Sequence, residues 1–154
     1  MEKKINTAAA PMKALDPLDR SLELLHFGFR GLTVEADRFL ATAGLSRVHH
    51  RMLYVIARAD QISVGDLAAT LGVSKQAAHR PLAQLFEREL VTYHREPERH
   101  RFKLLALTEQ GTQMEATATE FERTRLRDAF AQTDAQGQQA WMAVMLALAG
   151  HLNR

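Results

Sequence analysis

The sequence predicts a mainly α-helical chain that contains one β-hairpin, a mixed α+β fold in which helices dominate. Three features lead to this prediction. Two short helical segments meet at a tight turn, Leu71-Gly72-Val73. Two strand-like segments joined by a charged turn follow directly, within residues 90–107. Long segments with helical spacing of apolar residues stand before and after, and the 154-residue chain suits one domain or one subunit of a compact dimer.

Two helices are expected before this central segment. Residues 1–14 show no sustained period. Asp16 suits an N-cap and Pro17 suits the first helical position, so the first helix should span residues 16–43. A second helix should follow at residues 47–59. The first helix carries more apolar side chains than an outer helix of one small domain needs, which suggests burial against a second chain.

Residues 63–87 predict two helices joined by the tight turn. Ser63 and Ser74 are good N-caps because a serine hydroxyl accepts hydrogen bonds from the first helical turn. Asp66, three residues after Ser63, completes a pattern close to a capping box. Gly72 can take a left-handed conformation where the first helix must stop. Two helices joined in this way form a helix-turn-helix.

The second of these helices has one apolar side and one polar side. Ala78, Leu82 and Leu85 fall together on a helical wheel, so that side should face the core. The polar side carries Gln and Arg, which can pair with base edges, and Lys, which can contact phosphate. A solvated helix surface would give the same wheel. The residues of this segment that we expect to contact DNA are Ser74, Lys75, Gln76, His79, Arg80 and Gln84.

A basic hairpin follows this helix. Residues 90–95 and 101–107 predict strands because they are rich in β-branched and aromatic residues, and residues 96–100 form a charged turn with a proline. Ile62 could add one short strand beside them. A hairpin in this place is a wing whose cations suit phosphates and the minor groove, although charge also protects an edge hairpin from aggregation. The wing residues that we expect at DNA are Arg95, Arg99, His100, Arg101 and Lys103.

Two further helices are expected at the C-terminal end. Thr108 should cap a long helix at residues 109–132, and Thr133 with Gln136 fits a capping box for the last helix, which ends near Leu152. These helices have more apolar surface than one small winged domain can bury. With the first helix, they predict an intertwined dimer interface that would place the two DNA-reading helices about 34 Å apart, one turn of DNA.

Charge and composition narrow the class of protein. The net charge is only +2, but residues 75–103 contain seven Lys or Arg against four Glu. There are no cysteines, which excludes structural disulfides, zinc ribbons and thiol switches. No signal peptide is recognisable, and the longest apolar run, Trp141–Ala149, is far shorter than the ~20 residues of a membrane span. We therefore expect a cytoplasmic bacterial protein without membrane contact.

The sequence offers little support for catalysis or metal binding. No phosphate loop, nucleophile elbow or paired catalytic carboxylates occur, so we expect neither an enzyme nor a cofactor. His49 and His50 are neighbours on one helix and point about 100° apart, so they cannot easily share one ion. The other histidines are scattered in the sequence, and we expect no metal site.

The central and flanking segments together resemble the MarR (multiple antibiotic resistance regulator) family of winged helix-turn-helix regulators. The resemblance rests on the run L-A-x-x-L-G-V-S-K at 67–75, on Leu90-Val91 before a basic wing, and on L-T-E-Q-G at 107–111. The flanking helices extend it over about 15–152. It implies a homodimeric regulator that binds a pseudo-palindromic operator in double-stranded DNA and is often released by a small phenolic or other lipophilic ligand.

We accordingly interpret residues 1–154 as a single domain with two functional lobes. Residues 15–45 and 109–152 should form dimerisation helices, and residues 46–108 should form the winged helix-turn-helix lobe. A ligand pocket is expected where the first, second and long helices meet, lined by Phe29, His49, His50, Arg51 and Tyr54. The other interpretation is that the two aromatic residues belong to the core and that the His and Arg side chains are exposed.

Three residues depart from the family pattern. Glu89 stands where Gly is common, which predicts a different backbone geometry at the corner between helix and wing. Arg99 replaces a usual Asp two residues before Arg101, so the wing should be more cationic. Pro81 lies inside the DNA-reading helix, removes one N–H and predicts a kink. We expect a repressor; the alternative is a winged-helix module that binds protein and no operator.

Overall fold

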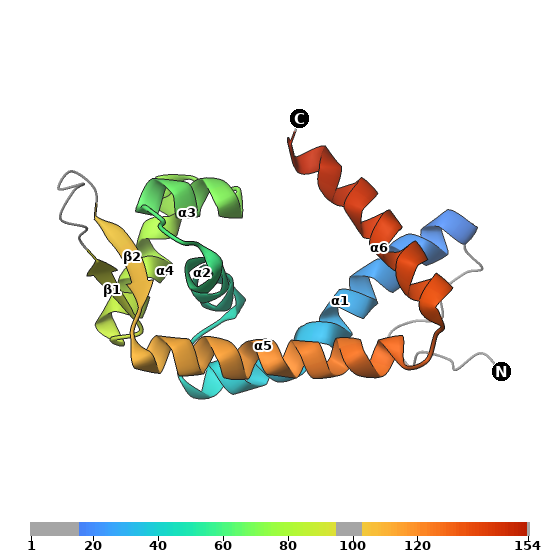
Figure 1. Ribbon diagram of the computed structural model, residues 1–154, viewed down its shortest axis with the longest axis horizontal. Helices are drawn as coiled ribbons and strands as arrows, with labels where there is room; N and C mark the ends of the chain where they lie inside the picture. The colour runs from blue at the N-terminus through green and yellow to red at the C-terminus, as the bar shows by residue number, and fades with distance from the viewer. Residues whose placement is uncertain (1–15, 95–102, 154) are drawn as a thin grey trace. The chain divides into compact units, whose positions relative to one another are not determined.

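The computed structural model describes residues 16–94 and 103–153. Its elements follow the predicted order, which confirms the mainly helical class with one hairpin (Figure 1). They are α1 (Pro17–Thr42), α2 (Arg47–Arg58), α3 (Val64–Leu71), α4 (Lys75–Glu87), β1 (Val91–His94), β2 (Leu104–Leu107), α5 (Glu109–Phe130), α6 (Ala135–Ala149) and a short 3-10 helix, η1 (Gly150–Asn153).

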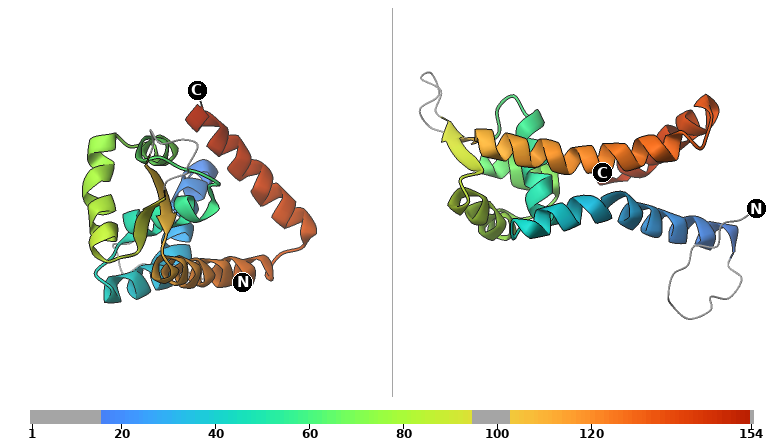
Figure 2. Two further views of the ribbon diagram at one scale, coloured as in Figure 1. Left: turned by 60° about the vertical axis from the view of Figure 1, so that its left-hand side comes forward. Right: turned by 90° about the horizontal axis from the view of Figure 1, so that it is seen from below.

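The chain divides into two compact units, Met1–Gly31 and Leu32–Arg154. In the first unit, the described residues belong to the N-terminal part of α1, and most of their large apolar side chains are exposed. In the second, α3, α4 and the hairpin gather near the start of α5, and α6 follows its far end (Figure 1 and Figure 2). The exposed side chains of the first unit are Leu18, Leu22, Leu24, Leu25 and Phe29.

One apolar cluster in the second unit joins the end of α1 with α2, α3, α4 and the hairpin. Leu40, Leu53 and Leu67 are completely buried in it. The apolar side of α4 enters the same cluster through Ala78, Leu82 and Leu85, as predicted. Burying side chains of this size stabilises a fold by about 1.5–3 kcal/mol each, so the opposite, polar side of α4 is turned outward.

The predicted caps of the helix-turn-helix are confirmed. Ser63 Oγ accepts from the Asp66 N–H at 3.1 Å, and the Asp66 carboxylate accepts from the Ser63 N–H at 3.2 Å. Gly72 ends α3 in the left-handed region, with a φ of 69°. Ser74 Oγ accepts from the Ala77 N–H at 3.0 Å and starts α4. The helix is then continuous through Pro81.

The hairpin is antiparallel, with Val91 opposite Leu107 and His94 opposite Leu104. Leu90 and Lys103, predicted as strand residues, lie just outside the two strands, and residues 95–102, which include the predicted turn, lie outside the described residues. The short third strand expected at Ile62 is a single bridge: the Leu105 N–H donates to the Ile62 carbonyl at 2.8 Å. The hairpin is therefore fixed to the start of α3 as well as to α4.

The predicted capping box at Thr133 and Gln136 is wrong. Asp134 is the N-cap of α6, and its Oδ1 accepts from the Gly137 N–H at 2.8 Å. Aspartate is a better cap than threonine because its charged oxygen also interacts favourably with the helix N-terminus. The helix consequently begins one residue later than the capping-box pattern indicated.

The corner between α4 and β1 keeps a left-handed residue without a glycine. Glu89 has a φ of 56°, and it is the only non-glycine residue with positive φ in the described part of the chain. The Leu90 N–H donates to the Leu85 carbonyl at 3.0 Å and the Glu89 N–H to the Phe86 carbonyl at 2.9 Å, which is a Schellman motif. Glu89 therefore takes the left-handed conformation that glycine usually supplies in this motif, at the expense of backbone strain.

We expect Glu89→Gly to stabilise the protein by about 0.5–1 kcal/mol, because glycine removes the strain but is more flexible in the unfolded chain. Urea unfolding at fixed protein concentration measures the change. Glu87→Gly is the matched control, since the same substitution two residues earlier falls on helical backbone and should destabilise by about 0.5–1 kcal/mol. A lower unfolding midpoint for Glu89→Gly would contradict the expectation.

Candidate nucleic-acid interface

The polar side of α4 is open to solvent. Lys75, Gln76, His79 and Arg80 are all exposed, and Ser74 at the N-cap is exposed as well. α4 packs against α2 and α3 on its apolar side and contacts β1. A helix of this kind, held from behind and bordered by a hairpin, has the geometry that enters a DNA major groove.

Lys75 lies over the start of α3. A Cβ atom added to Gly65 would be 2.9 Å from Lys75 Cε, so the absence of a side chain at Gly65 leaves room for the lysine. Hydrogen bonds from the Ser63 hydroxyl and N–H lower the pKa of the Asp66 carboxyl, and Lys75 contributes further. The ammonium group of Lys75 thus lies close to the first turn of α3.

Aromatic stacking fixes the base of the hairpin to α4. The rings of Phe86 and Tyr93 are 4.6 Å apart between centroids, and Lys103 Nζ lies 5.1 Å from the Tyr93 ring centroid. Lys103 is exposed. The other predicted wing residues lie outside the described residues; they are Arg95, Arg99, His100 and Arg101.

Gln84, predicted to contact DNA, is half-buried and turned toward α2. Its Oε1 lies 2.8 Å from His49 Nε2. The helical wheel placed Gln84 at the margin of the polar side, where a side chain can turn either way, and a buried imidazole nearby decides the direction. Gln84 is therefore not among the DNA contacts that we propose.

Of the residues predicted to line a ligand pocket, Phe29 belongs to the first compact unit, and the four that belong to the second are not gathered around one cavity. His49 and His50 are buried, with exposed fractions of 6% and 4%, and they point to different helices. Phe29 and Tyr54 are 42% and 41% exposed, so they are not core residues either. The Tyr54 ring instead makes a cation–π contact with Arg58, whose Cζ lies 3.5 Å from the ring centroid. Arg51, with Arg47, borders a small hollow between α2 and the turn before α4.

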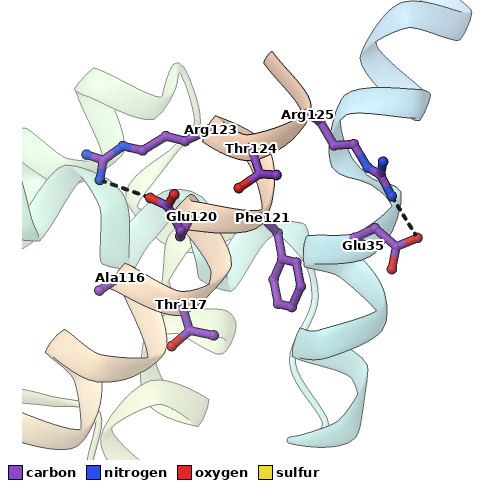
Figure 3. Close-up of a pocket in the computed structure, with 8 residues that line it drawn as sticks. All are labelled: Glu35, Ala116, Thr117, Glu120, Phe121, Arg123, Thr124 and Arg125. Atoms are coloured by element: carbon purple, nitrogen blue, oxygen red, sulfur yellow. Dashed lines mark ion pairs between the residues drawn. The ribbon is translucent and has the colours of Figure 1, made fainter. Parts of the chain in front are cut away.

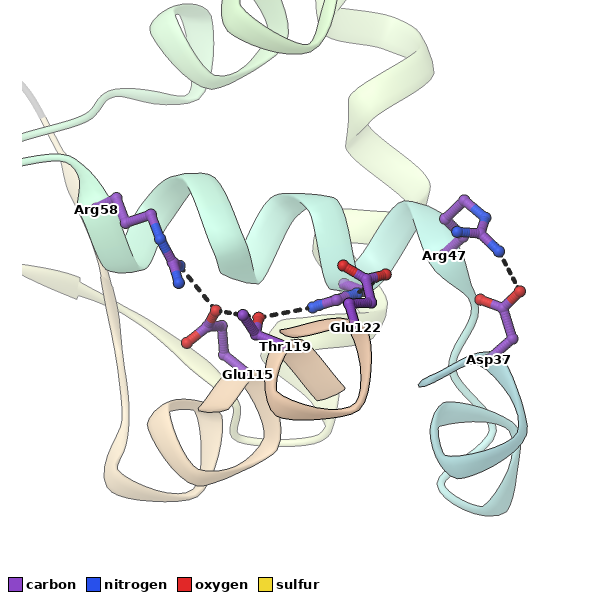
Figure 4. A network of polar contacts seen from close by, with 7 residues as sticks. Asp37, Arg47, Arg58, Glu115, Thr119 and Glu122 are labelled. Atoms are coloured by element: carbon purple, nitrogen blue, oxygen red, sulfur yellow. Dashed lines mark hydrogen bonds and ion pairs between the residues drawn. The ribbon is translucent and has the colours of Figure 1, made fainter. Parts of the chain in front are cut away.

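A buried polar network joins α2 to α5 (Figure 4). Glu115 Oε1 accepts from Arg58 Nη1 at 2.7 Å and from the Thr119 hydroxyl at 2.6 Å. Because the Thr119 hydrogen is given to Glu115, Thr119 Oγ1 must accept from His50 Nε2, at 3.0 Å. Sequence reasoning missed this network; its signal was two polar residues, Glu115 and Thr119, on the side of a helix that also buries Ala118.

The second nitrogen of His50 faces a carboxylate. His50 Nδ1 lies 3.5 Å from Glu122 Oε1. Burial lowers the pKa of His50, while the charge of Glu115 acts in the opposite direction. Burial also raises the pKa of the Glu122 carboxyl. At the far end of this region, Arg47 pairs with Asp37 and so links the start of α2 to α1.

A cavity lies between α1 and α5 (Figure 3). Its volume is about 770 Å³. Phe121 projects from α5 toward α1 within it, and Arg125 pairs with Glu35 across it at 3.7 Å. No sequence motif had indicated this cavity. The remaining lining residues are Ala116, Thr117, Glu120, Arg123 and Thr124.

Metal sites and membrane-spanning helices can be assessed for residues 16–94 and 103–153. Within them, no group of three or more His, Cys, Asp or Glu side chains is placed to hold a metal ion. No helix in the same part of the chain combines the length and apolar character needed to cross a membrane.

His50 should make stability depend on pH. Because its pKa is lower in the folded state than the ordinary 6.5, the unfolded chain binds a proton first, and stability should fall as pH drops below about 6.5. The slope is at most about 1.4 kcal/mol per pH unit for one proton. Glu122 acts with the opposite sign at more acidic pH, since its raised pKa lets the folded state hold a proton more tightly.

Urea unfolding of wild type and His50→Gln from about pH 7.5 to about pH 5.5 isolates the histidine contribution. The wild type should lose stability across this range more steeply than the variant. His94→Gln, which removes an exposed histidine, serves as control and should follow the wild-type profile. Parallel profiles for all three proteins would show that the burial of His50 has no such effect.

Comparison with known proteins identifies the family. A sequence model described as MarR family matches residues 43–101. The chain is 32% identical over 133 residues to the HTH-type transcriptional regulator PetP of Rhodobacter capsulatus, covering 86% of this chain and 80% of that protein.

Solved structures share the fold. A MarR family transcription regulator superposes with a TM-score of 0.73 at 19% identity, covering 88% of this chain and 90% of that one. A mutant of S. aureus MepR bound to an oligodeoxyribonucleotide superposes with a TM-score of 0.59 at 16% identity, covering 86% and 97%. The chain therefore belongs to the MarR family, and it is a DNA-binding winged helix-turn-helix transcriptional regulator, not an enzyme.

Proposed function

We propose that this protein is a homodimeric repressor that binds a pseudo-palindromic operator through α4 and the wing of each subunit. The observation that carries the proposal is the exposed polar side of α4, which is held in place by its buried apolar side. The excess of positive charge in residues 75–103 adds the attraction for phosphate. MepR, which shares the fold, was solved with a bound oligodeoxyribonucleotide, and this supports DNA as the ligand of the present protein.

The proposed contacts divide by chemistry. Gln76 and Arg80 have side chains that can form bidentate pairs with base edges, and they lie one helical turn apart. Ser74, Lys75 and His79 are placed for the phosphates that border the groove. On the wing, the proposed cations are Lys103 and, from the sequence alone, Arg95, Arg99, His100 and Arg101.

Dimerisation is supported by apolar surface that one chain leaves uncovered. No residue of α6 is buried, and Leu146 on this helix is 66% exposed. The N-terminal part of α1 is equally apolar and exposed. Contiguous apolar patches on a protein surface are typical of interfaces. We propose residues 15–45 and 109–152 as the dimerisation lobe and residues 46–108 as the DNA-binding lobe.

The cavity between α1 and α5 is the place where we propose that a small aromatic ligand acts as inducer. Phe121, whose ring lies 5.7 Å from that of Phe39 between centroids, offers an aromatic surface there. A ligand would release DNA only if it bound the DNA-free arrangement more tightly than the DNA-bound one. As a transcriptional regulator, the protein would act in the cytoplasm, where the chromosome lies.

Substitutions on α4 test the DNA contacts. Gln76→Ala and Arg80→Ala should each weaken operator binding by about 1–3 kcal/mol and relax the preference at particular base pairs. Gln113→Ala, an exposed amide on α5, is the control and should leave affinity unchanged. Fluorescence anisotropy across a salt series should give a slope near −0.9 per phosphate contact. Binding that ignores both salt and these substitutions would instead favour a protein-interaction module.

A charge on α6 tests the dimer. Leu146→Glu should raise the dimer dissociation constant at least about 100-fold, because two symmetry-related leucines lose their burial and two carboxylates meet. Ala69→Glu places the same charge on an exposed position of α3 and should leave the dimer intact. Sedimentation at micromolar concentration measures both. A wild type that sediments only as a monomer would refute the dimer.

A further inference from the structure

We infer that His49 is a positioning residue that fixes the rotation of α4 through Gln84, and thereby sets the base preference of the DNA-reading side chains. His49 is in the first turn of α2 and is 6% exposed. It is not on the DNA-binding surface and has no place among the proposed contacts. The inference rests on the proposal that α4 reads base pairs.

The hydrogen bonds of the His49 ring define where its proton lies. The Ser46 N–H is 3.0 Å from Nδ1, and a backbone N–H can only donate. Nδ1 must therefore present its lone pair, and the ring proton is on Nε2. Nε2 then donates to Gln84 Oε1 at 2.8 Å. Both ring nitrogens are satisfied, which is the condition for burying an imidazole without loss of stability.

Gln84 belongs to the same column of side chains as the proposed reading residues. Gln76, Arg80 and Gln84 are spaced by four residues, so they lie along one strip of α4. A rotation of α4 about its axis that moved Arg80 relative to DNA would also move Gln84 away from His49 Nε2. A hydrogen bond weakens steeply with distance and angle, so the His49–Gln84 bond resists that rotation.

The apolar contacts of α4 do not supply the same constraint, and its other directional contact lies at the far end of the helix, where Arg88 Nε donates to the Ala43 carbonyl at 3.2 Å. Ala78, Leu82 and Leu85 bury apolar surface, and this interaction is not directional. Pro81 has no N–H to donate to the Ala77 carbonyl, so one internal hydrogen bond of the helix is missing close to the reading residues. A directional tie from outside the helix therefore has a larger role here than in an uninterrupted helix.

The experiment is selection of bound sequences from a random DNA library, followed by affinity measurements on selected and scrambled DNA. His49→Ala and Gln84→Leu should each lower the ratio of specific to non-specific affinity by about fivefold to thirtyfold. Binding to scrambled DNA should stay within about twofold, because the phosphate contacts remain. The double variant should lose no more than either single variant, since both remove one interaction.

Two comparisons separate positioning from a general structural effect. His50→Ala removes the neighbouring buried histidine, which is bonded to α5 and not to α4, and should preserve the base preference. Gln84→Glu keeps an acceptor for Nε2 and should also preserve it, although its added charge lowers affinity for every sequence. In NMR spectra of the wild-type protein, the His49 Nε2 proton should be visible and Nδ1 should be unprotonated.

Several results would overturn the inference. Equal relaxation of base preference in His49→Ala and His50→Ala would make His49 a structural residue only. Relaxation in Gln84→Leu without any in His49→Ala would mean that Gln84 contacts DNA itself. If His49→Ala does not fold, Gln84→Leu and the NMR tautomer decide. A wild type that selects no sequence would overturn the DNA-reading proposal together with this inference, whereas a selective wild type with unaffected variants overturns the inference alone.

Discussion

The fold depends on how α2 buries two adjacent imidazoles. A buried polar group without a partner costs about 1–3 kcal/mol, so each ring requires a hydrogen-bonding neighbour. His49 finds one on α4, and His50 finds one on α5. Because consecutive residues of a helix point about 100° apart, these two neighbours must stand on different sides of α2. The positions of α4, the proposed DNA-reading helix, and of α5, the long helix, are thus both fixed relative to α2.

A second constraint is the amount of apolar surface at the chain ends. The core around α2, α3, α4 and the hairpin closes within one chain, but α6 contributes no buried residue to it. An isolated apolar helix gains little stability in water from its own hydrogen bonds. In the proposed dimer, the free energy that holds α6 in place would come from surface that the second chain covers, so dimerisation and folding of this region should be coupled.

Local signals in the sequence were sufficient for much of the fold and insufficient for the polar interior. The caps at Ser63 and Ser74 and the apolar side of α4 were predictable because each depends on residues within one or two helical turns. Gln84 and Glu115 were not, since whether a polar side chain turns inward depends on a partner dozens of residues away. The backbone conformation of Glu89 could not be predicted from local sequence either, because the hydrogen bonds around this residue outweigh the preference of a non-glycine residue against positive φ.

The hydrogen bonds around α2 also bear on how a ligand could act. Arg58, Glu115, Thr119 and His50 join α2 to α5 through short directional contacts, and Gln84 extends the connection to α4. Sliding α5 along α2 would break several buried hydrogen bonds at once, which a weakly bound ligand cannot offset. α2, α4 and α5 should therefore move as one body. On the proposed mechanism, a ligand in the cavity beside Phe121 would release DNA by changing the separation between the DNA-binding lobes of the two subunits. It would not distort α4 within either subunit.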